Sequence, residues 1–421
     1  MSLPNPSQDE LARSQALEAL LTERIRADGP MRFADYMQAA LYEPGHGYYV
    51  TGKSIFGRGG DFQTAPTIGK LFGECLAEQC LEVLRAIQAV PHTDGHTECS
   101  GILEFGAGNG ELAAALLPRL YQRCIDEQLP LPAYHVIEPS AALRESQQQC
   151  IAAALREHKF ESELPAVQWH MKLPVSFTGV VIANEVLDAM PVESCCFRDG
   201  AVFLQQVESD GQKLTGDYRP ADSTFSAMIA SRYREQLSDL PSDYCFEINS
   251  ALDGWVAALG SMLVTGAALI VDYGYPRREL FLPERHAGTL MCYYRHHAHS
   301  DPFFLPGQQD ITAHVDFTSL AEAAATSGLE LNGYCTQAAF LQANGLIELA
   351  STGAISIEQG ANELMNTNPD SELAGHLQMM QQVKTLTLPG GMGERFQVMA
   401  LSCNLDFGLQ GFSREDLSHR L

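Results

Sequence analysis

The stretch ILEFGAGNGELAAALL, residues 102–117, decides the fold of this chain. A short apolar run ends at Phe105, three glycines follow at every second position, and a helical pattern begins at Glu111. Strand, glycine-rich turn and helix in this order are typical of the first unit of a nucleotide-binding α/β fold, because glycine lets the backbone turn tightly and approach a ligand. The stretch therefore predicts an open α/β sheet with a ligand at the glycine turn.

Apolar runs and helical patterns alternate along the rest of the chain. Further strands are expected at residues 134–138, 180–184 and 268–273, a helix at 140–158, and a late strand of the same sheet at 395–403. Strands that alternate with helices indicate a mostly parallel sheet with helices on both faces.

Two stretches depart from this alternation. Asp199-Gly200 and Asp210-Gly211 each lie between alternating segments, which predicts a small β-meander inserted after a core strand. The stretch from Pro276 to Asp316 has little periodicity, and we expect a long functional loop there. The predicted organisation begins with an N-terminal helical and glycine-rich segment (1–64), a first part of the core (65–190) and an insertion (191–243). More core (244–275), a substrate loop (276–315) and a C-terminal part of the core with a helical insertion (316–421) follow.

The spacing of the glycines bears on the ligand. A dinucleotide fingerprint, GxGxxG, would place its third glycine at Glu111, where an anionic side chain suits a pyrophosphate poorly. The observed GxGxG, with an acid in the strand and another at the end of the next strand to bind a ribose diol, suits S-adenosyl-L-methionine, whose sulfonium and ammonium are cationic. A nicotinamide enzyme and a purely structural turn are the alternatives. The predicted cofactor-binding residues here are Glu104, Gly106, Gly108, Gly110 and Glu138.

The third strand ends in ANEVLDAMPVE, residues 183–193. Its carboxyl end is expected over the sulfonium, so Asn184 is assigned to the cofactor and Glu185 and Asp188 to catalysis. The N/D-P-P-Y type of sequence, used for methylation of bases or glutamine, is not present at this strand end. Two carboxylates suit a cationic acceptor, and arginine fits because its guanidinium stays charged and binds carboxylates in a fork. The alternative is that Asp188 only caps the following segment.

The overall composition restricts partners and location. Lys and Arg number 27 against 52 Asp and Glu, a net charge of −25, which argues against duplex nucleic acid as a partner. No apolar run approaches the roughly 20 residues of a membrane span. The eleven cysteines include no CxxC pair, and the N-terminus is polar, so we expect a cytoplasmic protein with reduced thiols.

The chain resembles the MidA-type methyltransferases, the group that includes a mitochondrial complex I assembly factor acting on arginine. The resemblance extends from about Ile25 to about Leu405. Its marks are YEPGHGYY, GDFQTAPTIGKLFGE, LEFGAGNGELA, ANEVLDAMPVE, IVDYGYP, GTLMCYYRHHAHSDPF, PGQQDITAHVDFT and GERFQVMAL. It implies a class I, Rossmann-like methyltransferase core with a helical and β cap, Asp61 and Thr64 beside the cofactor, and symmetric arginine dimethylation as the leading activity.

Two further polar clusters are candidates for the acceptor side. In QQDITAHVDF, Asp310 and His314 are predicted to bind substrate, whereas Asp316 is expected to cap the next helix. Asp272 is either a site acid or the polar end of a strand. The cluster His296, His297 and His299 is interpreted as a gating loop rather than a metal site, because methyl transfer from a sulfonium needs no metal.

Three functions remain open from the sequence. The leading one is methylation of arginine on a protein, with a subunit of the respiratory-complex type implied by the resemblance. The others are methylation of a small molecule and an assembly module that keeps a cofactor site. A homodimer is expected only on the general frequency of symmetric assembly.

Overall fold

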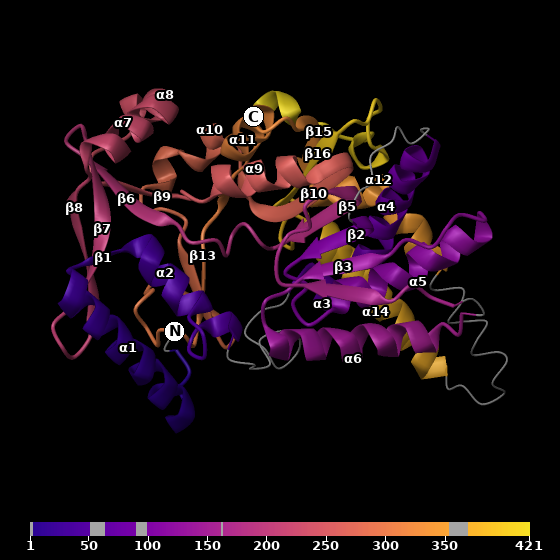
Figure 1. The fold of residues 1–421 in the computed structure, drawn as a ribbon, viewed down its shortest axis with the longest axis horizontal. Helices are drawn as coiled ribbons and strands as arrows, with labels where there is room; N and C mark the ends of the chain where they lie inside the picture. Colours follow the sequence, from indigo (N-terminus) through magenta and orange to yellow (C-terminus); the bar gives the residue numbers. More distant parts are fainter. Residues whose placement is uncertain (1–2, 51–63, 90–98, 161–162, 353–368) are drawn as a thin grey trace. The chain divides into compact units, whose positions relative to one another are not determined.

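Residues 101–105 lie inside the central sheet of the computed structural model, which describes residues 3–50, 64–89, 99–160, 163–352 and 369–421 (Figure 1). The chain forms two units, each built from three stretches of sequence. The core unit comprises residues 63–186, 256–273 and 321–421, and the second unit comprises 1–62, 187–255 and 274–320.

The core unit contains a mixed sheet in the order β15-β16-β10-β5-β2-β3-β4. Neighbouring strands from β10 to β4 are parallel, and β16 runs antiparallel to both β10 and β15. The strands are β2 (Cys99–Phe105), β3 (Tyr134–Ile137), β4 (Val167–His170), β5 (Phe177–Asn184), β10 (Leu263–Tyr275), β15 (Glu330–Thr336) and β16 (Phe396–Cys403).

Amphipathic helices supply the apolar packing of this sheet. Helices α4 and α5 bury their apolar stripes with Ile102, Val180 and Leu269 of the sheet in one hydrophobic cluster, and Figure 1 shows α5 and α6 alongside the strands. The helices are α3 (Ala65–Ile68), α4 (Leu71–Ala89), α5 (Glu111–Asp126), α6 (Ala141–Glu157), α9 (Leu252–Met262), α11 (Phe317–Thr326), α12 (Gln337–Ala343) and α14 (Pro369–Thr387), with short 3-10 turns η3 (Gln410–Phe412) and η4 (Ser418–Arg420).

Three glycines stand side by side across β2, β5 and β10. Gly179 pairs with Gly101 on one side and with Gly266 on the other, and all three have positive φ, between 124° and 145°. A Cβ on Gly179 would lie 2.0 Å from the carbonyl oxygen of Gly101, and one on Gly266 would lie 1.8 Å from that of Gly179. The close approach of the three strands at this level therefore requires glycine.

The second unit contains two small antiparallel sheets. One has the order β1-β7-β6-β9 with β8 beside β7, and the other has the order β12-β11-β13. The strands are β1 (Met31–Arg32), β6 (Glu193–Arg198), β7 (Ala201–Ser209), β8 (Leu214–Pro220), β9 (Tyr244–Ile248), β11 (Met291–Tyr294), β12 (His297–His299), β13 (Asp310–Thr312) and β14 (Val315–Asp316), which pairs with the end of β10. The helices are α1 (Gln8–Asp28), α2 (Phe33–Tyr42), α7 (Ser223–Arg232), α8 (Arg234–Asp239) and α10 (Arg277–Leu280), with η1 (Tyr48–Val50) and η2 (Pro283–Arg285).

The predicted α/β fold with an open sheet is confirmed, and so is the β-meander. Strands β6 and β7 turn at Asp199-Gly200, and β7 and β8 turn around Gly211. The stretch from Pro276 to Asp316, expected to be one long loop, instead contains the short strands β11 to β14, and its substrate role stays a prediction. These strands are two to four residues long, too short to show a period in sequence. No helix among the described residues is long and apolar enough to cross a membrane.

Candidate functional site

The glycine turn after β2 has the tight geometry that its sequence predicts. Gly106, Gly108 and Gly110 have φ of 58°, 53° and 91°, in the left-handed region. Gly110 precedes the first residue of α5, and its amide donates to the carbonyl of Ala107 at 2.8 Å. A Cβ on Gly110 would lie 2.9 Å from the Cα of Gln147, so glycine is required there for packing as well as for φ.

Glu138 follows β3, and its carboxylate is held by α6. Oε1 accepts from the amide of Ser140 at 2.9 Å, and Oε2 accepts from Nε2 of Gln147 at 3.1 Å. Burial raises the pKa of Glu138, while these hydrogen bonds act in the opposite direction. Gln147 also donates to the carbonyl of Gly108 at 2.9 Å, so one fully buried amide joins the glycine turn to the acid. The sequence analysis missed Gln147, whose only signal was a polar residue on the buried side of a helix.

Glu104 lies in β2 with its side chain in the buried interior. The carboxylate accepts from the hydroxyl of Tyr134 at 2.7 Å, and its residue is 2% exposed. Burial raises the pKa of Glu104 to about 7. A bound cation near this group would favour its ionised form.

The end of β5 is followed by Glu185, which has an unusual backbone conformation. Glu185 has φ of 52°, and its amide donates to the carbonyl of Val271 on β10 at 2.9 Å. Its Oε1 is 3.2 Å from the donor Nδ2 of Asn184 and 3.4 Å from the amide of Ala65. Positive φ at a non-glycine residue costs free energy, and residues held in this way cluster at functional sites.

Asp272 supports this strand end from β10. Its side chain is fully buried and accepts from the amides of Val186 at 3.2 Å and Tyr273 at 2.9 Å. Asp272 therefore fixes the backbone that follows Glu185, which is a positioning role.

Of the two residues expected beside the cofactor from GDFQTAP, only one is described. Asp61 lies outside the described residues. Thr64 precedes α3, and its carbonyl accepts from the hydroxyl of Thr67 at 2.8 Å. The next residue, Ala65, is the one whose amide reaches Glu185.

In the second unit, Asp188 and Asp310 lie around the hydroxyl of Tyr49. Asp310 accepts from this hydroxyl at 2.8 Å, and burial, followed by the charges of the two carboxylates, raises the pKa of Tyr49. Both aspartates are at most 4% exposed. The carbonyl of Asp188 accepts from the amide of Ala313 at 3.0 Å. The structure therefore brings together two acids that are far apart in the sequence, and adds Tyr49, which the sequence analysis had not assigned to the site.

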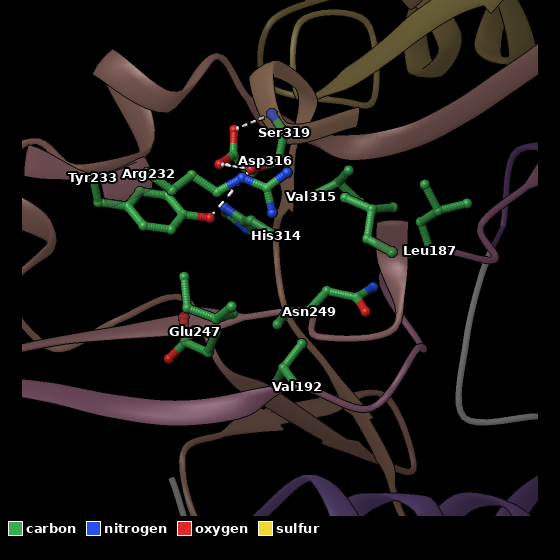
Figure 2. Close-up of a pocket in the computed structure, with 13 residues that line it drawn as sticks. Leu187, Val192, Arg232, Tyr233, Glu247, Asn249, His314, Val315, Asp316 and Ser319 are labelled. Carbon is green, nitrogen blue, oxygen red and sulfur yellow. Dashed lines mark hydrogen bonds between the residues drawn. The ribbon is translucent and has the colours of Figure 1, made fainter. Parts of the chain in front are cut away.

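His314 lines a small cavity of the second unit, shown in Figure 2. Its amide donates to the hydroxyl of Thr289 at 3.1 Å, and its ring centroid is 5.4 Å from that of Tyr275. Glu247 and Asn249 also line this cavity. Its volume of about 30 Å³ is enough for water but not for an arginine side chain.

Asp316 lines the same cavity, where Figure 2 shows it with Ser319, and it forms a buried ion pair with Arg277. It accepts from Nε of Arg277 at 3.2 Å and from the amide of Ser319 at 3.0 Å in the first turn of α11. The predicted capping role of Asp316 is thus confirmed. The guanidinium of Arg277 also lies over the ring of Tyr233, 4.8 Å from its centroid.

The histidine cluster does not form an irregular loop. His297 and His299 belong to β12, which pairs with β11, and His296 has a positive φ of 62° in the turn that joins the two strands. The gating role proposed for these residues stays a prediction.

Two observations test whether the core unit suits S-adenosyl-L-methionine. The glycine turn and the buried carboxylate of Glu138 lie together, because the side chain of Gln147 donates to both the carbonyl of Gly108 and Glu138. The buried Oδ1 of Asn184 has no hydrogen-bond partner within the described residues, and a ligand donor would satisfy it. With an acid at each of two neighbouring strands, these features suit the cofactor of a methyltransferase.

Comparison with known proteins agrees with this class. Residues 75–335 match the family model described as "Putative S-adenosyl-L-methionine-dependent methyltransferase", and the chain belongs to that family. A crystal structure of a Burkholderia thailandensis protein bound to S-adenosyl-homocysteine is 35% identical, with 100% of both chains covered and a TM-score of 0.85. A native crystal structure from the same organism is also 35% identical over 100% of both chains, with a TM-score of 0.81.

Curated relatives cover most of the chain as well. A Drosophila melanogaster protein named protein arginine methyltransferase NDUFAF7 homolog, mitochondrial, is 28% identical over 98% of this chain and 93% of its own length. The Danio rerio protein arginine methyltransferase NDUFAF7, mitochondrial, is 28% identical over 90% of this chain and 85% of its own length. The protein is therefore a SAM-dependent methyltransferase, and the resemblance to the MidA type is confirmed.

The predicted cytoplasmic location is contradicted by the same relatives. Their names place them in mitochondria, so the similarity points to mitochondria rather than to the cytoplasm. The polar N-terminus and reduced thiols, on which the prediction depended, do not distinguish between the two compartments.

Proposed function

We propose that this protein methylates arginine side chains of a protein substrate. The observation that carries the proposal is Glu185, whose backbone at the end of β5 has a strained positive φ and is followed by an amide that Asp272 holds. The names of relatives that are 28% identical over most of the chain support arginine as the acceptor. We further propose that the substrate is a subunit of the respiratory-complex type and that its arginine is symmetrically dimethylated. We also propose that the enzyme is a homodimer.

We assign cofactor binding to the core unit. Glu138 would bind the ribose diol, the turn at Gly106, Gly108 and Gly110 would surround the ligand, and Asn184 would accept from it; Glu104, Asp61 and Thr64 are assigned here as well. S-adenosyl-L-methionine supplies an electrophilic methyl group on its sulfonium when it is bound. Gln147 keeps the Glu138 carboxylate in place through its hydrogen bond of 3.1 Å.

We assign acceptor binding to Glu185 of the core unit. Glu185 would bind the guanidinium in a fork and orient one nitrogen, since in-line displacement depends on position. It would also take up the proton that the methylated nitrogen releases. For the second unit, the assignments of Asp188 to catalysis and of Asp310 and His314 to the substrate stay predictions from the sequence.

The test uses methyl-labelled S-adenosyl-L-methionine and a lysate from cells that lack the protein. Label in methylarginine after hydrolysis of the protein fraction is the expected result, reduced about 100-fold or more by Glu185→Gln. Cofactor affinity of this variant, measured by calorimetry, should stay within a factor of three or so of wild type, because Glu185 is assigned to the acceptor. Glu157→Gln, an exposed change on α6, is the matched control.

Other outcomes decide between the alternatives. Label found only in the small-molecule fraction would replace the protein substrate by a metabolite. Full activity of Glu185→Gln would refute its assignment to the acceptor. Cofactor binding without any label would favour an assembly module.

A further inference from the structure

Three side chains that are typical metal ligands meet on one face of the core sheet. Cys99, His135 and His170 come from the adjacent strands β2, β3 and β4, and their ligand atoms all lie within 4.8 Å of one another. The register places His135 opposite Leu103 and His170 opposite Ile137, and the ring of His135 extends along β2 to the carbonyl of Ser100, the residue after Cys99. Alternation along each strand then places the three side chains on the same face.

The two imidazoles are oriented as a metal site requires. Nε2 of His135 is 3.3 Å from the carbonyl oxygen of Ser100, and Nδ1 is 3.0 Å from Nε2 of His170. A carbonyl only accepts hydrogen bonds, so Nε2 of His135 carries its proton and Nδ1 presents a lone pair toward His170. Histidines that bind metals commonly donate their other N–H to a carbonyl in this way.

The backbone holds the sulfur ligand near these rings. Cys99 forms no disulfide bond, and its amide donates to the carbonyl of Ser176 at 3.2 Å in the ladder with β5. Cys99 and His170 are half-buried, whereas His135 is 2% exposed, so an ion can reach the cluster from the solvent side. The face is the one opposite Glu104, which makes the cluster separate from the groups assigned to the cofactor.

We propose that Cys99, His135 and His170 bind a divalent ion of the zinc type. One thiolate and two imidazoles are ligands that Zn²⁺ prefers, in a tetrahedral arrangement whose fourth position is left for water. The ion would join the edge strand β4 to β2 and β3. The carbonyl of His170 accepts from the amide of Glu138 at 3.0 Å, so the ion would also steady the strand end that carries this acid.

Cobalt is the probe for the test, because Co²⁺ accepts the same ligands and absorbs light. The full-length protein is freed of metal with a chelator and titrated with Co²⁺. The expected result is one ion per chain, a tetrahedral spectrum with a thiolate-to-cobalt charge-transfer band, and displacement by Zn²⁺. Cys99→Ser should abolish the charge-transfer band, and His170→Ala should weaken binding about tenfold or more.

Matched controls are available on the same unit. Cys403→Ser changes another half-buried cysteine, on β16, and His158→Ala changes an exposed histidine after α6; neither should alter the titration. Absence of the charge-transfer band in the wild-type protein, or its persistence in Cys99→Ser, would overturn the proposal and leave a hydrogen-bonded histidine pair. These readouts do not depend on methyl transfer, so they are independent of the proposed activity.

Discussion

The buried carboxyl of Glu104 makes the stability of the core unit depend on pH in a defined way. Its pKa is about 7 in the folded protein against an ordinary value of 4.5. Between these two values the folded state holds a proton that the unfolded state has lost, so the free energy of unfolding falls as the pH rises. The difference of about 2.5 pH units corresponds to ~3 kcal/mol.

Glu104→Gln removes this titration and keeps the acceptor for the hydroxyl of Tyr134, 2.7 Å away in the wild type. We therefore expect the variant to gain ~3 kcal/mol relative to wild type between pH 4.5 and pH 8, since only the wild type must bury a charge at the higher pH. The measurement is guanidinium unfolding of both proteins without cofactor at closely spaced pH values.

Glu145→Gln is the control, because Glu145 lies exposed on α6. Its free energy of unfolding should stay within ~0.5 kcal/mol of the wild-type value at every pH. The account of a desolvated carboxyl would be refuted if the difference in unfolding free energy between Glu104→Gln and wild type did not change with pH, or if it increased as the pH falls.

Three other changes have expected results of a simpler kind. Gly179→Ala should lower the free energy of unfolding by ~3 kcal/mol or more, since its Cβ would meet a carbonyl oxygen at 2.0 Å, whereas Gly254→Ala on α9, where nothing lies within 4 Å, should cost nothing; chemical denaturation compares the two. Asp316→Ala leaves the buried guanidinium of Arg277 without its carboxylate, and we expect thermal unfolding to report a loss of ~3 kcal/mol, with unchanged stability contradicting the ion pair. Glu138→Gln should lower the affinity for S-adenosyl-L-methionine about tenfold, as measured by calorimetry. An unchanged affinity would contradict the assignment of Glu138 to the ribose site.

The sequence predicted those elements of the fold whose formation is determined by residues close together in the chain. The glycine turn, α5 and the buried strands β2, β5 and β10 each have a pattern of their own. Strand β4 was missed because its four residues are only partly buried and show no alternation. The antiparallel direction of β16 was also beyond prediction, since strand pairing is a tertiary property.

In the candidate site too, residues with a local sequence signal were predicted, and residues that act through long-range contacts were not. Glu104, Glu138 and Glu185 were found because each stands at or near the end of an apolar strand. Gln147 and Tyr49 act through contacts made across long separations in sequence, to Glu138 and Asp310 respectively. No spacing rule connects such pairs, and the meeting of Cys99 with two histidines is another example.

The position of β16 has a consequence for synthesis of the chain. It is the last strand in the sequence, yet it lies between β15 and β10 rather than at an edge. A growing chain that has reached residue 390 therefore has β10 and β15 complete but no strand to join them. The ribosome must deliver the residues of β16, up to Cys403, before this part of the sheet can close, and until then both strands expose unpaired edges on which chaperones or neighbouring nascent chains can act.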